Sequence, residues 1–123
     1  MELLLLFLAV HFVADFIFQT DWQARNKSKN IRALTNHVFS YMIVFAAGAV
    51  FISIRHPEIL PQLYLFVMVN VVLHWCTDFC TSKVTAYLWS QEKTHDFFVV
   101  VGFDQLIHQA TIAGTIAYFY GVR

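Results

Sequence analysis

Four apolar segments follow one another closely along this chain, and they leave it few possible folds. They occupy approximately residues 3–19, 31–54, 59–89 and 97–120. A helix needs about 20 apolar residues to cross the hydrocarbon core of a membrane, where backbone groups must find hydrogen bonds within the protein itself. The sequence therefore predicts an all-α fold, an integral membrane four-helix bundle that forms a single transmembrane domain over residues 1–123.

The composition agrees with a surface that faces lipid. Hydrophobic residues make up 59% of the chain and charged residues only 13%, whereas about a quarter of a soluble domain is charged. The net charge is zero with neutral histidines, which argues against a nucleic-acid partner. The first segment has Glu2 as its only early charge and no cleavage pattern of small residues, so we expect a retained helix rather than a signal peptide.

The connections between the segments differ in charge, and this difference predicts the orientation. Arg55 and Arg123 fall on the side of the two termini. The opposite side holds six basic residues: Arg25, Lys27, Lys29, Arg32, Lys83 and Lys93. By the positive-inside rule, the second side is cytoplasmic. We therefore expect a multi-pass protein of the inner (cytoplasmic) membrane with both termini on the non-cytoplasmic side.

Histidine and aspartate residues interrupt all four apolar segments. Ionisable residues inside a membrane span are costly and point to function. Three pairs have the spacing i, i+4, and one histidine stands alone: His11 with Asp15, His74 with Asp78, Asp104 with His108, and His37. The spacing puts both members of a pair on one helix face, about 6 Å apart along the axis.

The order of residues within the pairs places them at a common depth. The first and third segments read His before Asp, and the fourth, which runs in the opposite direction, reads Asp before His. The aspartate of each pair therefore lies nearer the basic side, with the histidine one turn deeper. His37 lies about two turns in from the same side. A shared polar site explains this arrangement better than helix stability does.

Four histidines and three aspartates supply nitrogen and oxygen ligands, which suit zinc, manganese or iron better than calcium or magnesium. Seven groups exceed the four ligands of one tetrahedral zinc, so we expect one or two divalent ions, with two ions sharing an aspartate. The expected metal ligands are His11, Asp15, His37, His74, Asp78, Asp104 and His108. A proton pathway or a structural network of hydrogen bonds stays open as an alternative use of these residues.

Other polar residues border the expected site. Gln19, Asn70 and Gln105 are expected to orient the ligands or to bond between helices. Lys83 is a candidate contact for a substrate phosphate, with a snorkelling anchor as the alternative. Cys76 and Cys80 are expected as buried, reduced thiols on the helix face opposite His74, and not as ligands.

Several blocks also resemble a known family. They are the stretch from His11 to Gln19, Lys27, the stretch from Leu34 to His37, His74 with Asp78, and the group Asp104, Gln105 and His108. Together they resemble an uncharacterised family of small bacterial and phage membrane proteins, a domain of unknown function. The family pattern implies a lysine about one turn after the third-segment aspartate, but Thr81 stands there and Lys83 follows two residues later. The pattern is similar in style to membrane-bound metal-dependent hydrolases.

Three functions remain in view. The first is a metal-dependent hydrolase that acts on a lipid phosphate or another headgroup ester at the cytoplasmic leaflet. The second is a carrier or channel for divalent metal or protons, which with four helices per chain would need a homo-oligomer. The third is a non-catalytic membrane module that binds partner proteins, with a structural metal or a polar network. All three have the lipid bilayer as a partner, and only the first requires a lipid or phosphorylated substrate.

Overall fold

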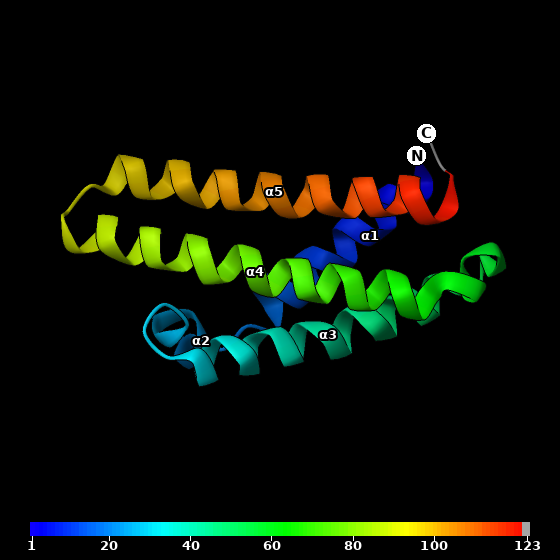
Figure 1. The fold of residues 1–123 in the computed structure, drawn as a ribbon, viewed down its shortest axis with the longest axis horizontal. Coiled ribbons are helices and arrows are strands. Elements are labelled where there is room, and N and C mark those ends of the chain that lie inside the picture. The colour runs from blue at the N-terminus through cyan, green and yellow to red at the C-terminus, as the bar shows by residue number, and fades with distance from the viewer. Residues whose placement is uncertain (122–123) are drawn as a thin grey trace.

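The computed structural model describes residues 1–121, and these residues form helices joined by short connections, without a β-strand. Arg123, used above to predict the orientation, lies outside the described residues. In chain order the elements are α1 (Glu2–Phe12), the π-helical turn η1 (Val13–Ile17), α2 (Asp21–Asn26), α3 (Ile31–Ser53), the 3₁₀ turn η2 (Pro57–Gln62), α4 (Leu63–Ser90) and α5 (Thr94–Tyr120) (Figure 1). The all-α prediction is confirmed.

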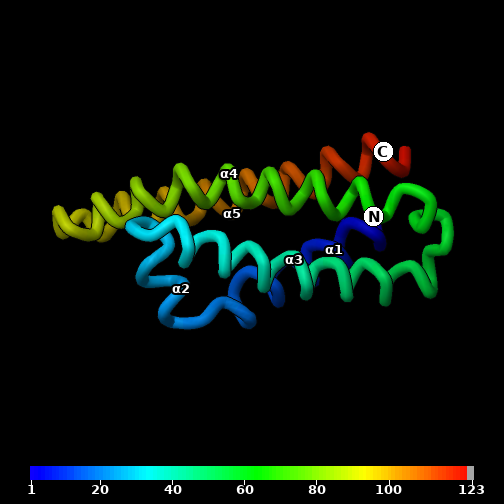
Figure 2. Tube along the Cα trace, turned by 60° about the horizontal axis from the view of Figure 1, so that its bottom comes forward, coloured from blue at the N-terminus to red at the C-terminus, as the bar shows by residue number. Residues whose placement is uncertain are grey.

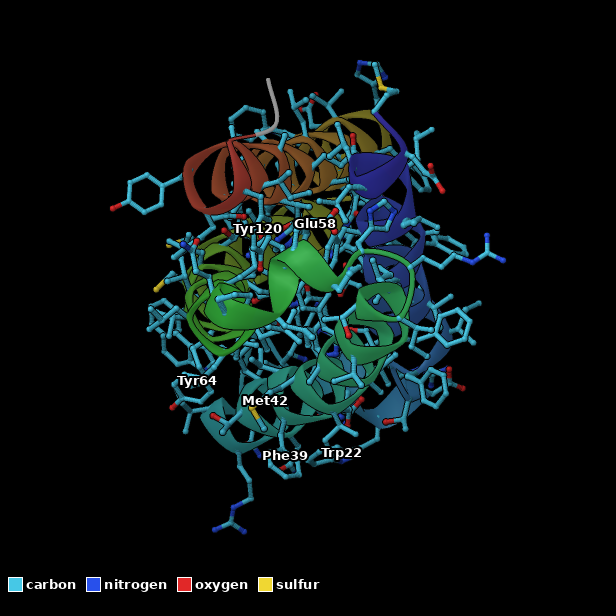
Figure 3. The ribbon with its side chains drawn as sticks, turned by 90° about the vertical axis from the view of Figure 1, so that its right-hand side faces the viewer. Trp22, Phe39, Met42, Glu58, Tyr64 and Tyr120 are labelled. Carbon is cyan, nitrogen blue, oxygen red and sulfur yellow. The ribbon has the colours of Figure 1, made fainter. Side chains whose placement is uncertain are left out.

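Four of the helices surround one core. Helix α1 packs against α3 and α5, and α4 packs against the same two helices, so the four form a ring, as the end-on view in Figure 3 shows. The N-terminus and the end of α5 lie at one end of the bundle (Figures 1 and 2). Helix α2 and the turn between α4 and α5 lie toward the other end, which we call the hairpin end.

Three stretches among the described residues are long and apolar enough to cross a membrane: α3, η2 with α4, and α5. Helix α1 has 11 residues and η1 adds five. At 1.5 Å per residue these 16 residues measure about 24 Å, short of the roughly 30 Å hydrocarbon core. The first of the four expected spans therefore packs in the bundle, but it is shorter than a helix that crosses the hydrocarbon core.

The sequence explains why this first helix ends early. The Phe18 amide donates to the Val13 carbonyl over 3.1 Å, an i to i−5 bond that widens the last turn into a π-helix. Thr20 then caps α2, because its hydroxyl accepts from the Gln23 amide and its own amide donates to the Gln23 side chain. The expected continuous helix over 3–19 is thus two elements, with the chain turning away before α2.

Aromatic side chains fill the half of the core nearer the termini. Phe7 lies between Phe45 and Phe66, with ring centroids 5.6 and 4.7 Å away. All three side chains are fully buried. Near them α1 approaches α3 closely, since a Cβ added to Gly48 would lie 2.5 Å from a methyl group of Val10. Small residues allow such close backbone contact between membrane helices.

One expectation about the outer surface is wrong. Cys76 and Cys80 are free thiols, as expected, but both are exposed rather than buried. The helical wheel that put them opposite His74 also put them opposite the core, and in a membrane bundle that face meets lipid. Their apolar neighbours in sequence therefore do not indicate burial within the protein.

Candidate metal centre

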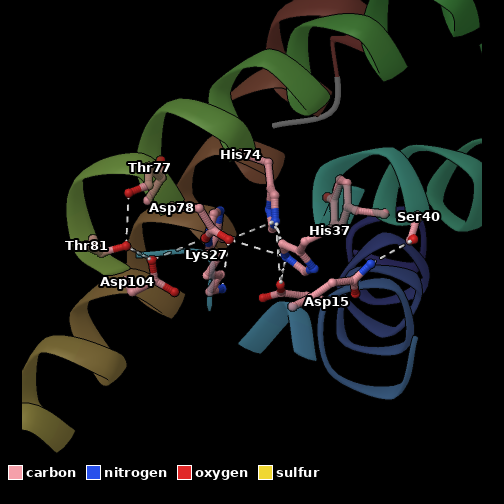
Figure 4. A network of polar contacts seen from close by, with 12 residues as sticks. Asp15, Lys27, His37, Ser40, His74, Thr77, Asp78, Thr81 and Asp104 are labelled. Atoms are coloured by element: carbon pink, nitrogen blue, oxygen red, sulfur yellow. Dashed lines mark hydrogen bonds and ion pairs between the residues drawn. The ribbon is translucent and has the colours of Figure 1, made fainter. Parts of the chain in front are cut away.

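The first cluster of ligand atoms lies at the middle of the bundle and comes from three elements. Asp15 lies in the π-helical turn η1, His37 on α3, and His74 with Asp78 on α4. All four side chains are buried, and one ligand atom from each lies within 4.8 Å of all the others. Figure 4 shows the four side chains pointing toward one another. We call them the first ligand group.

The distances within this group match a metal coordination sphere. His37 Nε2 lies 3.1 Å from Asp15 Oδ1, 3.2 Å from Asp78 Oδ2 and 3.3 Å from His74 Nε2. His74 Nε2 lies 3.5 Å from the same Asp15 oxygen and 3.8 Å from the same Asp78 oxygen. Tetrahedral zinc ligands at about 2.1 Å from the ion lie about 3.4 Å from one another. The five distances, from 3.1 to 3.8 Å, are therefore close to those between the ligands of such a site.

A second ligand group shares Asp78 with the first. It consists of Asp78, Asp104 and His108. His108 Nε2 lies 3.3 Å from Asp78 Oδ1 and 3.5 Å from Asp104 Oδ1. Asp78 thus directs Oδ2 into the first group and Oδ1 into the second. A carboxylate used in this way bridges two adjacent ions in dinuclear metal sites.

Two neighbouring side chains hold the outer carboxylates in place. Thr81 donates its hydroxyl to Asp104 over 2.6 Å. The Gln105 amide lies 3.1 Å from oxygens of both Asp15 and Asp104, so it ties the two groups together. The sequence singled out Gln105 for such a role. Sequence reasoning gave Thr81 no role in the site, although its position one turn after Asp78 puts it on the same face of α4.

Lys27 also reaches the site, from outside the membrane-spanning helices. It follows α2 in the connection to α3, and its Nζ donates to Asp78 Oδ2 over 2.8 Å (Figure 4). Burial disfavours its ammonium, but the carboxylates of Asp78 and Asp15 outweigh this effect and raise the pKa of Lys27 above its ordinary value. From the sequence, Lys27 was interpreted mainly as one of the basic residues that set the orientation in the membrane. A connection has no regular periodicity, so the sequence does not show where the Lys27 side chain points.

The charges of the cluster leave room for a cation. The carboxyl groups of Asp15, Asp78 and Asp104 carry three negative charges when ionised, and Lys27 carries one positive charge. An aspartate at the centre of a membrane helix costs about 3 kcal/mol. Two protonated imidazoles or one divalent ion would balance the remaining two charges, and a second ion would draw in a further anion.

His11 lies beside the two groups and belongs to neither among the described residues. Its Nε2 is 3.7 Å from Asp15 Oδ2 and 3.4 Å from the Gln105 oxygen, and its Nδ1 is 3.2 Å from the Tyr41 hydroxyl. Tyr41 also stacks on His74, with ring centroids 3.9 Å apart and planes 10° from parallel. Sequence reasoning missed Tyr41, although it follows His37 by one turn of α3.

The remaining singled-out residues lie outside the cluster. Asn70 bonds to Thr115 over 3.0 Å and joins α4 to α5 one turn nearer the termini. Gln19 borders a cavity next to the site. Lys83 is exposed and places its Nζ 3.0 Å above the Phe79 ring centroid, and it does not line that cavity.

This cavity of about 710 Å³ connects the cluster to the surface at the hairpin end. Its lining includes the buried Asp15 and the exposed Phe98. Its walls come from η1, from α2 and the connection after it, from the second half of α4 and from the first half of α5. The site is therefore accessible to a molecule larger than water.

A comparison with protein families finds one match over nearly the whole chain. The sequence model described as "Protein of unknown function (DUF3307)" matches residues 3–122. No curated protein and no solved structure matches the chain.

Proposed function

This chain belongs to the DUF3307 family, and we propose that it is a metal-dependent hydrolase of the membrane that cleaves a lipid phosphate or another headgroup ester. The observation that carries the proposal is the position of Asp78, which offers one oxygen to each ligand group beside a cavity of about 710 Å³. We propose two adjacent positions for zinc, manganese or iron. Divalent ions there would bring the pKa of a bound water toward neutrality and polarise a phosphoryl oxygen.

The protein itself would supply position and charge. In the first group, Asp15, His37 and His74 would hold an ion beside Asp78. Lys27 keeps a fixed positive charge next to the bridging carboxylate, where it would stabilise negative charge that develops on a phosphoryl group. Thr81 and Gln105 hold Asp104 so that the second position keeps its shape.

The apolar half of the core favours hydrolysis over transport. A carrier or channel for divalent metal or protons needs polar groups along its whole path. Asn70 and Thr115 extend the polar core by one layer, but Phe7, Phe45 and Phe66 fill the bundle beyond them. A site that is open at one end and closed at the other suits a substrate that enters and leaves by the same route.

We further propose that the hairpin end faces the cytoplasm and that both termini lie on the non-cytoplasmic side of the inner membrane. Arg25, Lys27 and Lys29 cluster at the hairpin end, in accord with the positive-inside rule. The site would then open toward the cytoplasmic leaflet.

The first test measures metal by elemental mass spectrometry on detergent-purified protein, beside the double variant His74→Ala/Asp78→Ala. We expect up to two equivalents of zinc, manganese or iron in the native protein and none in the double variant. His95→Ala, which changes an exposed histidine outside the cluster, should keep the native content. Circular dichroism and size-exclusion chromatography establish that each variant is folded.

The second test supplies lipid phosphates to the metal-loaded protein and measures released phosphate, with Asp78→Ala as the inactive control. Native protein that binds metal but turns over no substrate at any metal loading would contradict the hydrolase. Variants that lose the fold together with the metal would instead favour a structural metal in an interaction module.

A further inference from the structure

The cavity beside the metal centre has a polar end, an apolar wall and a basic rim. Asp15 and Asp104 lie at its inner end, next to the ligand groups. Arg25, Lys27 and Lys29 line it on the side of α2 and the connection that follows. Of these three basic side chains, only Lys27 pairs with a carboxylate among the described residues, that of Asp78.

Two buried polar atoms on the wall of the cavity have no partner in residues 1–121. Ser82 is 7% exposed, and its hydroxyl makes no hydrogen bond. The Gln19 side-chain oxygen is likewise buried and unpaired. Both residues line the cavity, Ser82 from α4 and Gln19 from the connection between η1 and α2. Buried polar groups normally have a partner. Both oxygens are closed to solvent in this structure, so each side chain would rotate toward the cavity to meet a bound molecule.

The opposite wall is apolar and reaches the lipid-facing surface. Phe16 on η1 and Phe98 on α5 both line the cavity, and they are 44% and 62% exposed. Phe97 also lines this wall, and Val101 extends it along α5 toward Asp104. An opening bordered by exposed aromatic rings on a membrane-spanning helix faces the acyl chains of the bilayer and not water.

We infer that this cavity binds a single phospholipid with a terminal phosphate monoester, which enters sideways from the bilayer between η1 and α5. Its phosphate lies among Arg25, Lys27 and Lys29, because guanidinium and ammonium groups are the strongest phosphate partners in proteins. An ester oxygen of its backbone accepts from the Ser82 hydroxyl, and a hydroxyl group of the lipid donates to the Gln19 oxygen. Its acyl chain lies along the apolar wall.

This assignment rests on the proposed function, since it names the substrate class and the residues that recognise it. It also replaces Lys83 as the phosphate contact. The Lys83 side chain lies over Phe79 and does not line the cavity, whereas Arg25 on α2 and Lys29 in the connection after it both do.

The experiment measures lipid binding separately from hydrolysis. Native mass spectrometry of the metal-loaded protein uses a phosphonate analogue of phosphatidic acid, whose carbon–phosphorus bond resists cleavage, with phosphatidylcholine and inorganic phosphate as competing probes. We expect the phosphonate lipid to bind at least about tenfold more tightly than phosphatidylcholine, which carries a cation next to its phosphate.

Two variants test the assigned walls. Arg25→Gln/Lys29→Gln should lower the affinity for the phosphonate lipid at least about tenfold and leave the metal content unchanged. Val101→Trp should fill the cavity and exclude the lipid. The matched control is Arg32→Gln, which removes an exposed basic residue in the first turn of α3 that does not line the cavity.

Equal binding of the two lipids, or unchanged binding in both test variants, would overturn the inference. Loss of inorganic phosphate binding in the double variant, with no lipid bound to native protein, would assign the basic rim to a soluble phosphate and also overturn it. Neither result would contradict the proposed function, because metal content and released phosphate test that function independently.

Discussion

The two halves of the bundle core are built by the same four helices and filled in opposite ways. Toward the termini, Phe7, Phe45 and Phe66 pack as fully buried rings. Toward the hairpin end, Asp15 and Asp78 lie among imidazoles at hydrogen-bond distance. Apolar packing stabilises the first half, whereas the second half brings like charges together, which a bound cation would stabilise.

Tyr41 lies at the boundary between the two halves. Its ring stacks on Phe45 with centroids 5.2 Å apart and on His74 with centroids 3.9 Å apart. Tyr41 on α3 therefore contacts both the apolar half of the core and a candidate metal ligand. Apolar packing and the candidate ion site thus occupy different parts of the bundle axis and meet at Tyr41, so most positions in one half can be changed without contact with the other.

Separate changes to the two ligand groups should give the largest effect. Asp15→Asn should remove the ion of the first group and keep that of the second, while Asp104→Asn should do the reverse. Each replacement keeps the shape of the side chain and removes its charge. Elemental mass spectrometry should find about one equivalent fewer than in native protein for each variant. An unchanged content in Asp104→Asn would mean that the second group holds no ion.

Truncation in the apolar half should lower stability and spare the metal. Phe45→Ala removes a fully buried ring and should cost about 3–5 kcal/mol in free energy of unfolding. Thermal denaturation in detergent measures this cost, and the metal content of the folded variant should equal that of native protein. Loss of metal with Phe45→Ala would show that the two halves are not independent.

A smaller loss is expected where α1 and α3 are closest. The methyl group of Gly48→Ala would meet Val10 at 2.5 Å, so the helices must separate, at a cost of about 1–3 kcal/mol. Val10→Ala in the same chain should restore much of the lost stability, because it removes the methyl groups in the way. Equal denaturation temperatures for the single and double variants would contradict this packing.

The smallest effect is expected at Lys83. Its side chain is exposed and lies over Phe79, so Lys83→Gln should change stability by less than about 0.5 kcal/mol. Phosphate release by the metal-loaded protein should also stay at the native level, whereas Lys27→Gln should lower it at least about tenfold. A large loss of activity with Lys83→Gln would contradict this prediction and show that Lys83 takes part in the reaction.

The comparison between prediction and structure is clearest for the three His/Asp pairs. Because the spacing i, i+4 fixes a shared helix face, His74 with Asp78 and Asp104 with His108 could be placed at one level before any packing was known. His11 followed the same pattern, yet the π-helical turn changes the path of the backbone just before Asp15. The spacing alone does not show where a helix departs from 3.6 residues per turn.

The sequence by itself determined the helical class, the apolar surface and the common depth of the polar residues, since these depend on local periodicity and on the solubility of side chains in lipid. Only the tertiary structure decided that Asp78 joins two ligand groups, that Lys27 folds back onto it and that Lys83 points away. Those outcomes depend on which helices become neighbours and on the path of a connection. Neither of these produces a periodic pattern of residues in the sequence.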